Sequence, residues 1–167
     1  MSSAFNEFAD NKELELAPED MTKAMEEVDE WIYEGINNGV YRCGFAITQS
    51  AYDDAVKKLF ASMDRLEDLL ATRPYVAGDK FTLSDIRLWQ TLIRFDEVYV
   101  VYFKCDKRKV SEYPNIMAYM RRLWKMDGFK ETTNMAHIKG HYYTSHGKLN
   151  YYGVIPAGPD FIGKLEK

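Results

Sequence analysis

The sequence predicts a single all-α domain spanning residues 1–167. Four segments place apolar residues at intervals of three and four, the period of an amphipathic helix, and no segment shows the strict alternation of a half-buried strand. Hydrophobic residues make up 46% of the chain and charged residues 29%, a balance typical of globular domains. A chain of 167 residues is long enough to bury one sizeable core without a disulfide or a metal ion.

The first predicted helix begins at Pro18, because proline is favoured in the first turn of a helix. Its apolar stripe ends at Ile36. We expect the helix to stop at residues 37–39, Asn-Asn-Gly, since these residues readily adopt the left-handed conformation that terminates helices. On this interpretation Tyr41 and Cys43 lie in the loop that follows.

The second and third helices have clearer boundaries. The second runs from Thr48 or Ser50 to Ala71, with its apolar side chains along one face. The third begins at Thr82 with a capping box, in which the Asp85 carboxylate accepts from the Thr82 amide and the Thr82 hydroxyl accepts from the Asp85 amide. The apolar residues after Asp85 predict that this third helix is central and largely buried.

The helical pattern weakens towards the C-terminus. A fourth helix begins at Pro114, and one or two short helices follow Gly128. Residues 147–159 are rich in glycine and proline. We expect this tail to extend over the surface instead of packing as an element.

Charge and composition exclude several classes of protein. The chain has 22 basic and 26 acidic residues, a net charge of −4, whereas a nucleic-acid binder normally carries a basic face. The longest apolar run, residues 98–103, is far shorter than the ~20 residues that span a bilayer. The first residues lack the basic and apolar regions of a signal peptide, and the two cysteines form no Cys-X-X-Cys pattern. We therefore expect a cytoplasmic protein with reduced thiols that binds neither nucleic acid nor membrane.

The histidines and cysteines offer candidate sites that we do not favour. His137 and His141 would share one face of a helix and could hold a metal ion, with His146 close behind. No cysteine lies near them in the sequence, so we favour exposed or hydrogen-bonded histidines and expect no metal. For Cys43 we favour a non-catalytic thiol.

The tyrosines give the stronger hint of function. Twelve are present, and Tyr142, Tyr143, Tyr151 and Tyr152 all lie near the C-terminus, with Tyr41 outside any predicted helix. A tyrosine combines a flat apolar ring with a hydroxyl that donates or accepts a hydrogen bond. Such a cluster suits an aromatic ligand with oxygen substituents, but tyrosines that cover a core with solvated hydroxyls fit the composition equally well.

Five sequence blocks resemble a known family. They are NGVYRCGFA at residues 38–46, DIRL at 85–88, RFDEVYV at 94–100, FKC at 103–105 and HIKGHYYTSH at 137–146. In this order they resemble the glutathionyl-hydroquinone reductases, the Xi or omega-like class of glutathione transferases. The resemblance implies a helical bundle like the C-terminal domain of a glutathione S-transferase, with an irregular C-terminal tail.

The resemblance also implies a second domain that these residues do not contain. Members of the family carry an N-terminal thioredoxin-like domain with the catalytic cysteine and most of the contacts to the co-substrate glutathione. No Cys-Pro dipeptide occurs in residues 1–167. The chain therefore resembles the C-terminal half alone, which implies that by itself it binds no glutathione and is inactive.

The resemblance assigns roles to four residues. In the family, the catalytic cysteine attacks the glutathionyl sulfur of a glutathionyl-hydroquinone and releases the hydroquinone, and a second glutathione then clears the mixed disulfide. Tyr41 and Tyr142 match the tyrosines that hold the ring, where a hydroxyl stabilises developing phenolate-like charge and donates a proton. Tyr99 and His141 match further motif positions in the substrate-binding half.

The resemblance further implies the partners of the chain. They are a second copy, which would form a homodimer through the helical domain, the thioredoxin-like domain, and an aromatic, hydroquinone-type small molecule. The sequence leaves one alternative open, a stand-alone, non-enzymatic protein-interaction module with the same helical fold. The resemblance does not reach Tyr151 and Tyr152, where relatives usually have Pro-Thr, so it does not predict the path of the tail.

Overall fold

The computed structural model describes residues 6–167, which form helices and connecting loops with no β-strand. The all-α prediction is therefore confirmed for this range. Residues 1–5, where we expect no signal peptide, lie outside the described part of the chain. The helices in chain order are α1 (Thr22–Ile32), α2 (Asn38–Gly44), α3 (Gln49–Leu70), α4 (Leu83–Arg94), α5 (Val100–Tyr102), α6 (Pro114–Trp124), α7 (Met135–Ser145) and α8 (Phe161–Leu165).

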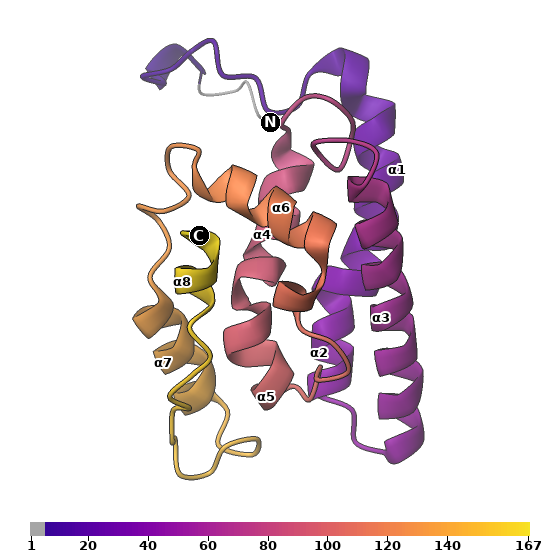
Figure 1. Cartoon of the computed structure of the whole chain (residues 1–167), viewed down its shortest axis with the longest axis vertical. Coiled ribbons are helices and arrows are strands. Elements are labelled where there is room, and N and C mark those ends of the chain that lie inside the picture. Colours follow the sequence, from indigo (N-terminus) through magenta and orange to yellow (C-terminus); the bar gives the residue numbers. More distant parts are fainter. Residues whose placement is uncertain (1–5) are drawn as a thin grey trace.

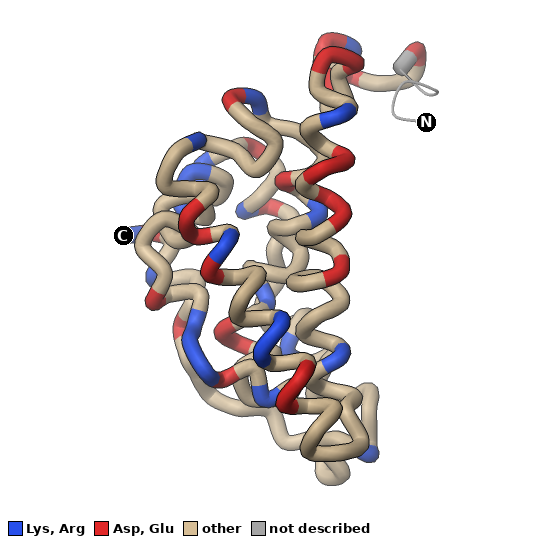
Figure 2. Tube along the Cα trace, turned by 90° about the vertical axis from the view of Figure 1, so that its right-hand side faces the viewer, with Lys and Arg blue, Asp and Glu red and all other residues tan. Residues whose placement is uncertain are grey.

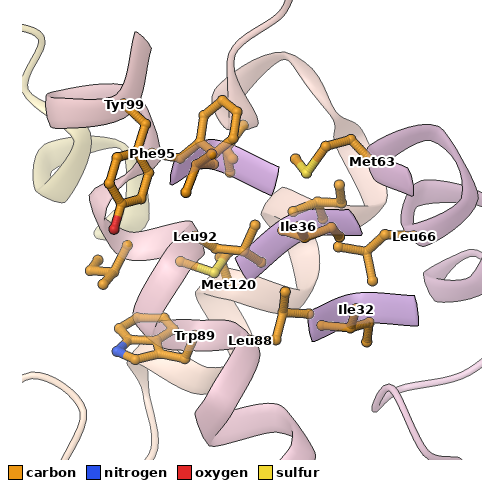
Figure 3. Packing of buried hydrophobic residues seen from close by; sticks show 14 of the residues in the cluster. Ile32, Ile36, Met63, Leu66, Leu88, Trp89, Leu92, Phe95, Tyr99 and Met120 are labelled. Atoms are coloured by element: carbon orange, nitrogen blue, oxygen red, sulfur yellow. The ribbon is translucent and has the colours of Figure 1, made fainter. Parts of the chain in front are cut away.

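Helix α4 runs through the middle of the molecule. Figure 1 shows α2 and α3 side by side at one edge and α7 with α8 at the opposite edge, with α4 and α5 between them. Leu88 and Leu92 of α4 are fully buried, and they lie among side chains from α1, α3 and α6 in the core (Figure 3). The predicted central position of this helix is confirmed.

The predicted stop at residues 37–39 is wrong, because the chain stays helical. A π-helical turn, Tyr33–Asn37, joins α1 directly to α2, and Asn37 and Asn38 both have right-handed helical backbone angles. The side-chain amide of Asn37 donates to the Arg87 carbonyl and to the Thr91 hydroxyl, each at 2.9 Å, instead of capping a helix end. Tyr41 and Cys43 consequently lie in α2 and not in a loop.

Gly39 has a packing role in place of the predicted terminating role. A Cβ atom added at this residue would lie 3.3 Å from Cδ1 of Leu59 on α3, tighter than an ordinary contact. The missing side chain lets α2 approach α3 closely. The contacts of Gly39 with α3 and of Asn37 with α4 therefore outweigh the intrinsic preference of Asn-Asn-Gly for ending a helix.

The predicted starts of α3 and α4 are confirmed. Thr48 caps α3 by accepting from the Ala51 amide at 3.2 Å. At α4, the buried Asp85 carboxylate accepts from the Thr82 amide at 2.8 Å, as the capping box predicts. The Thr82 hydroxyl also donates to this carboxylate, at 3.2 Å, so Asp85 receives two hydrogen bonds from one residue.

The C-terminal part combines predicted helices with one unexpected contact. Helix α6 begins at Pro114, and the short helix α7 follows Gly128 as expected. Residues 147–160 carry no helix, in agreement with an extended tail. The end of the chain is different, because Phe161 and Leu165 of α8 are buried against the core. The sequence placed the short helices before the tail, so the packed helix α8 after the tail was not predicted.

The surface carries an acidic excess along one helix. Helix α1 carries four acidic residues within one stretch, Glu26, Glu27, Asp29 and Glu30. Elsewhere on the face that Figure 2 shows, Lys and Arg are interspersed with Asp and Glu. Within residues 6–167, no helix is long and apolar enough to cross a membrane.

A glycine-to-alanine comparison tests the packing at the end of α2. A Cβ atom at Gly44 would overlap the Phe103 ring, whereas one at Gly147 would meet nothing within 4 Å. We expect Gly44→Ala to lower the free energy of unfolding by about 1–3 kcal/mol through overpacking, and Gly147→Ala to change it by less than about 0.5 kcal/mol. Urea denaturation of both variants provides the measurement. Equal stabilities would contradict the close contact between α2 and Phe103.

Candidate functional site

A buried ion pair fixes α7 against the end of α4. Helix α4 continues through a second π-helical turn, Phe95–Tyr99, into α5. Within that turn, Glu97 is 3% exposed and pairs with Lys139 of α7, Nζ to Oε2 at 3.2 Å. The other carboxylate oxygen accepts from the Phe161 amide at 2.8 Å, and the Glu97 carbonyl accepts from the Tyr143 hydroxyl at 3.1 Å. Glu97 thereby ties α7 and the start of α8 to the segment that carries Tyr99.

This arrangement brings three tyrosine hydroxyls together. The hydroxyl oxygens of Tyr41 on α2 and Tyr142 on α7 are 2.6 Å apart, and those of Tyr142 and Tyr99 are 2.8 Å apart. The Tyr99 ring stacks on Phe103 at 5.3 Å between centroids. Tyr41, Tyr142 and Tyr99 form a continuous hydroxyl chain, which we call the tyrosine chain, with Tyr142 in the middle.

The tyrosine chain lines a hollow of about 330 Å³ between α2, α4 and α7. Tyr41 is 39% exposed, whereas Tyr142 and Tyr99 are buried. The other lining residues are Tyr33, Asn37, Asn38, Gln90, Thr91 and Arg94. A second hollow of about 620 Å³ shares Tyr33, Asn37 and Gln90 with the first and extends along α1 and α4 to Arg87.

The surroundings of Tyr142 and Tyr99 raise the pKa of both hydroxyls. Burial raises the pKa of Tyr142 to about 12, and its hydrogen bond with Tyr41 acts in the same direction, while the Tyr99 hydrogen bond and the Arg94 charge oppose this rise. Burial and the neighbouring Tyr142 also raise the pKa of Tyr99. Tyr142 and Tyr99 therefore present neutral hydroxyls that can donate hydrogen bonds at neutral pH.

The other residues singled out from the sequence do not line this hollow. His141 is exposed on α7, with its ring against the edge of Tyr142 at 5.5 Å and Nδ1 3.3 Å from the Ser145 hydroxyl. Tyr151 and Tyr152 are exposed in the tail. Among the described residues, no group of three or more His, Cys, Asp or Glu side chains is arranged to hold a metal ion.

Residue-by-residue reasoning from the sequence missed much of the hollow. Tyr33 and Asn37 come from the first π-helical turn, and Arg94 is held by hydrogen bonds to Gln90 at the end of α4. Turns of this kind occur frequently at functional sites. The block at residues 94–100 contains Arg94, and its resemblance to the family was the only signal that could have singled this residue out.

The protonation of the buried tyrosines predicts a loss of stability at high pH. Burial raises the pKa of Tyr142 and of Tyr143 to about 12, while a tyrosine in an unfolded chain ionises near ~10. Between these values the folded chain holds protons that the unfolded chain releases, so the free energy of unfolding falls as the pH rises through this range. We expect the urea midpoint to fall from pH 9.5 to pH 11.5, and to fall less in Tyr142→Phe. A midpoint that is constant or rises would contradict this account.

Comparisons with known proteins identify the class of the chain. The family model described as "Glutathione S-transferase, C-terminal domain" matches residues 49–122. The glutathione-bound structure of YqjG from Escherichia coli superposes with a TM-score of 0.90 at 44% identity, covering 95% of this chain and 51% of that one. The chain therefore contains a glutathione S-transferase C-terminal domain, as the resemblance implied.

Two further comparisons indicate the subclass. The glutathionyl-hydroquinone reductase YqjG of Escherichia coli is 47% identical over 142 residues, which are 85% of this chain and 43% of the relative. The Xi transferase of Phanerochaete chrysosporium superposes with a TM-score of 0.91 at 44% identity, covering 96% of this chain and 55% of that one. The chain is homologous to the glutathionyl-hydroquinone reductases, the Xi-class, omega-like glutathione transferases. It spans about half the length of these relatives.

Proposed function

We propose that this chain is the aromatic-substrate half of a glutathione-dependent reductase that acts on glutathionyl-hydroquinones. The observation that carries the proposal is the tyrosine chain, which lines a hollow of about 330 Å³ with neutral hydroxyls beside Arg94. A single aromatic ring with hydroxyl substituents fits a hollow of this size. Homology to glutathionyl-hydroquinone reductases supports this choice of ring over other aromatic ligands.

The chain would contribute ring binding and proton donation to the reaction. When the carbon–sulfur bond of the substrate breaks, negative charge grows on the ring and its oxygens. Hydroxyls that already line the hollow in a fixed hydrogen-bonded chain stabilise that charge without reorganisation, and Tyr142 can donate a proton while receiving one from its hydrogen-bonded neighbours. The Arg94 charge favours the ionised form of Tyr142, which eases this donation.

The second hollow supports a site for the rest of the substrate. It shares the lining residues Tyr33, Asn37 and Gln90 with the hollow at the tyrosine chain and is larger, at about 620 Å³. We propose that the glutathionyl group lies here, at the face where a thioredoxin-like domain would supply the thiolate and the glutathione contacts. Solved relatives in this family contain bound glutathione, which supports this co-substrate.

The proposal includes a homodimer in the cytoplasm. Ile47 at the α2–α3 connection is 96% exposed, and Val154 in the tail is 68% exposed, which leaves apolar surface available for association. We expect light scattering at micromolar concentrations to give a mass above the 19.5 kDa of a single chain. A monomer at every concentration would contradict this prediction.

The test of the function uses the purified chain first. Cys43 and Cys105 are 2% and 0% exposed, so neither thiol is placed to attack a substrate in the tyrosine site. We expect no turnover of a glutathionyl-hydroquinone by residues 1–167 alone, and turnover once a thioredoxin-like domain of this family is joined to them. If the chain alone turns over the substrate and Cys43→Ser abolishes this activity, the assignment of the catalytic thiolate to another domain is wrong.

The alternative is a non-enzymatic interaction module with the same fold. Reading the transcript upstream of Met1 separates the two possibilities. An in-frame thioredoxin-like segment supports the reductase, and a stop codon directly upstream supports the module.

A further inference from the structure

Arg94 gives the hollow at the tyrosine chain a positive charge. Among the described residues that line this hollow, the others are tyrosines, side-chain amides and a threonine, so no carboxylate balances the charge. This distribution contrasts with the net charge of −4 on the whole chain. A concave surface with charge of a single sign favours a ligand of the opposite sign.

The guanidinium of Arg94 has no acidic partner within residues 6–167. By contrast, Arg42, Arg87 and Arg108 each form an ion pair with an acidic side chain. Arg94 is half-buried, and its Nη1 donates to the carbonyl and the side-chain oxygen of Gln90, one turn earlier in α4, at 2.5 Å and 2.9 Å. Because a guanidinium carries five N–H donors, it keeps donors for a ligand in the hollow.

The charge of Arg94 lies close to the middle of the tyrosine chain. Burial raises the pKa of Tyr142, and the Arg94 charge opposes this rise, which a charge does only from nearby. Both residues line one hollow of about 330 Å³, so a ring that contacts Tyr142 brings its substituents near the guanidinium. The planar guanidinium matches a carboxylate especially well, because the two groups form parallel hydrogen bonds.

We propose that the hollow selects aromatic rings that carry a carboxylate, and that Arg94 is the residue that recognises this group. The inference rests on the proposed function, because it adds one substituent to the hydroxylated ring assigned to the hollow. The carboxylate would pair with N–H groups of Arg94 that Gln90 does not use, while the ring hydroxyls bond to the tyrosine chain. The preferred substrate would then be the glutathionyl conjugate of a dihydroxybenzoate instead of an unsubstituted hydroquinone.

The test is an NMR titration of the ¹⁵N-labelled chain with three related ligands. They are hydroquinone, gentisate, which is hydroquinone with one ring carboxylate, and the methyl ester of gentisate, which keeps both hydroxyls and the carbonyl without the charge. We expect gentisate to bind about 10-fold more tightly than either neutral ligand, with shift changes at the Arg94 amide and guanidinium. Raising the ionic strength to about 0.5 M should reduce this preference and leave the binding of the neutral ligands unchanged.

Variants assign the preference to one side chain. Arg94→Gln removes the charge and should bind gentisate and its ester equally, while Arg94→Lys keeps the charge without the planar fork and should retain part of the preference. Arg108→Gln is the matched control, because Arg108 is also half-buried but pairs with Asp64 and does not line the hollow. This control should keep the full preference. The comparison of gentisate with its ester uses the unchanged protein and therefore tests the inference without any variant.

The outcomes separate this inference from the proposed function. If hydroquinone binds in the hollow and gentisate binds no more tightly, the inference is wrong and the ring site stands. A preference for gentisate that persists in Arg94→Gln would overturn the role of Arg94. If no ligand shifts the amides of Tyr41 and Tyr142, both the inference and the ring site are wrong. Gentisate shifts confined to a separate cavity of about 330 Å³, lined by Gly44 and Phe45 among others, would also contradict the inference.

Discussion

Tyr142→Phe is expected to lower turnover of a glutathionyl-hydroquinone by about 10²–10³-fold in a protein that joins this chain to a thioredoxin-like domain. The substitution keeps the ring and removes only the hydroxyl in the middle of the tyrosine chain. Because the proton and the stabilised charge are needed as the ring departs, turnover should fall more than the apparent affinity for the substrate. Steady-state kinetics with one glutathionyl-hydroquinone provide both values.

Three comparisons make this result specific. Tyr41→Phe removes the exposed end of the same hydroxyl chain and should also lower turnover, whereas Tyr151→Phe in the exposed tail should be nearly silent. In Tyr142→Phe the buried Tyr99 hydroxyl loses a partner, so we expect a stability loss of about 1–2 kcal/mol, too small to unfold the protein. Equal small effects on turnover at all three positions would mean that the tyrosines serve only packing.

Asp85→Ala is expected to have the largest effect on stability, about 3–4 kcal/mol. One carboxylate oxygen of Asp85 accepts from the Val76 amide and the Tyr119 hydroxyl, both at 3.0 Å, and the other accepts from the amide and hydroxyl of Thr82. Alanine removes the cap of α4 and leaves these buried donors without an acceptor. At this chain length the melting temperature should fall by roughly 10 °C, as thermal unfolding followed by circular dichroism would show.

Asp79→Ala is the matched control for this substitution. Asp79 precedes Asp85 by six residues, has the same side chain and is exposed. Its replacement should change the free energy of unfolding by less than about 0.5 kcal/mol. A similar loss at both positions would mean that the hydrogen bonds of Asp85 do not determine the stability of α4.

Local patterns predicted the helices whose boundaries depend on nearby residues. The cap at Thr48, the capping box at Thr82 and the proline at 114 act within one turn of the chain, and all three helices begin where the sequence predicts. The junction at residues 37–39 was different, because the hydrogen bonds of Asn37 to α4 and the contact of Gly39 with Leu59 come from distant parts of the sequence. Rules based on neighbouring residues do not include these distant partners in α3 and α4, so the continuation of the helix into α2 could not be predicted.

The candidate site, like the fold, could be predicted only in part from the sequence. Composition indicated that tyrosines are important, but it grouped Tyr151 and Tyr152 with Tyr142 because all three are close in sequence. The structure instead pairs Tyr142 with Tyr41, which is 101 positions away, and with Tyr99, which lies in an apolar run that gave no sign of a polar site. Only the resemblance to a family connected these three residues before the structure did.

The most direct test of the central claim is an NMR titration of the ¹⁵N-labelled chain with hydroquinone, which needs no second domain. The account predicts shift changes at the amides of Asn38, Tyr41, Thr91, Arg94 and Tyr142, which surround the hollow, with weaker binding in Tyr142→Phe. The amides around the separate cavity at Gly44, Phe45 and Leu149 should stay unchanged. Saturable shifts confined to any other surface, or binding of equal strength in Tyr142→Phe, would contradict the assignment of the tyrosine chain as the ring-binding site.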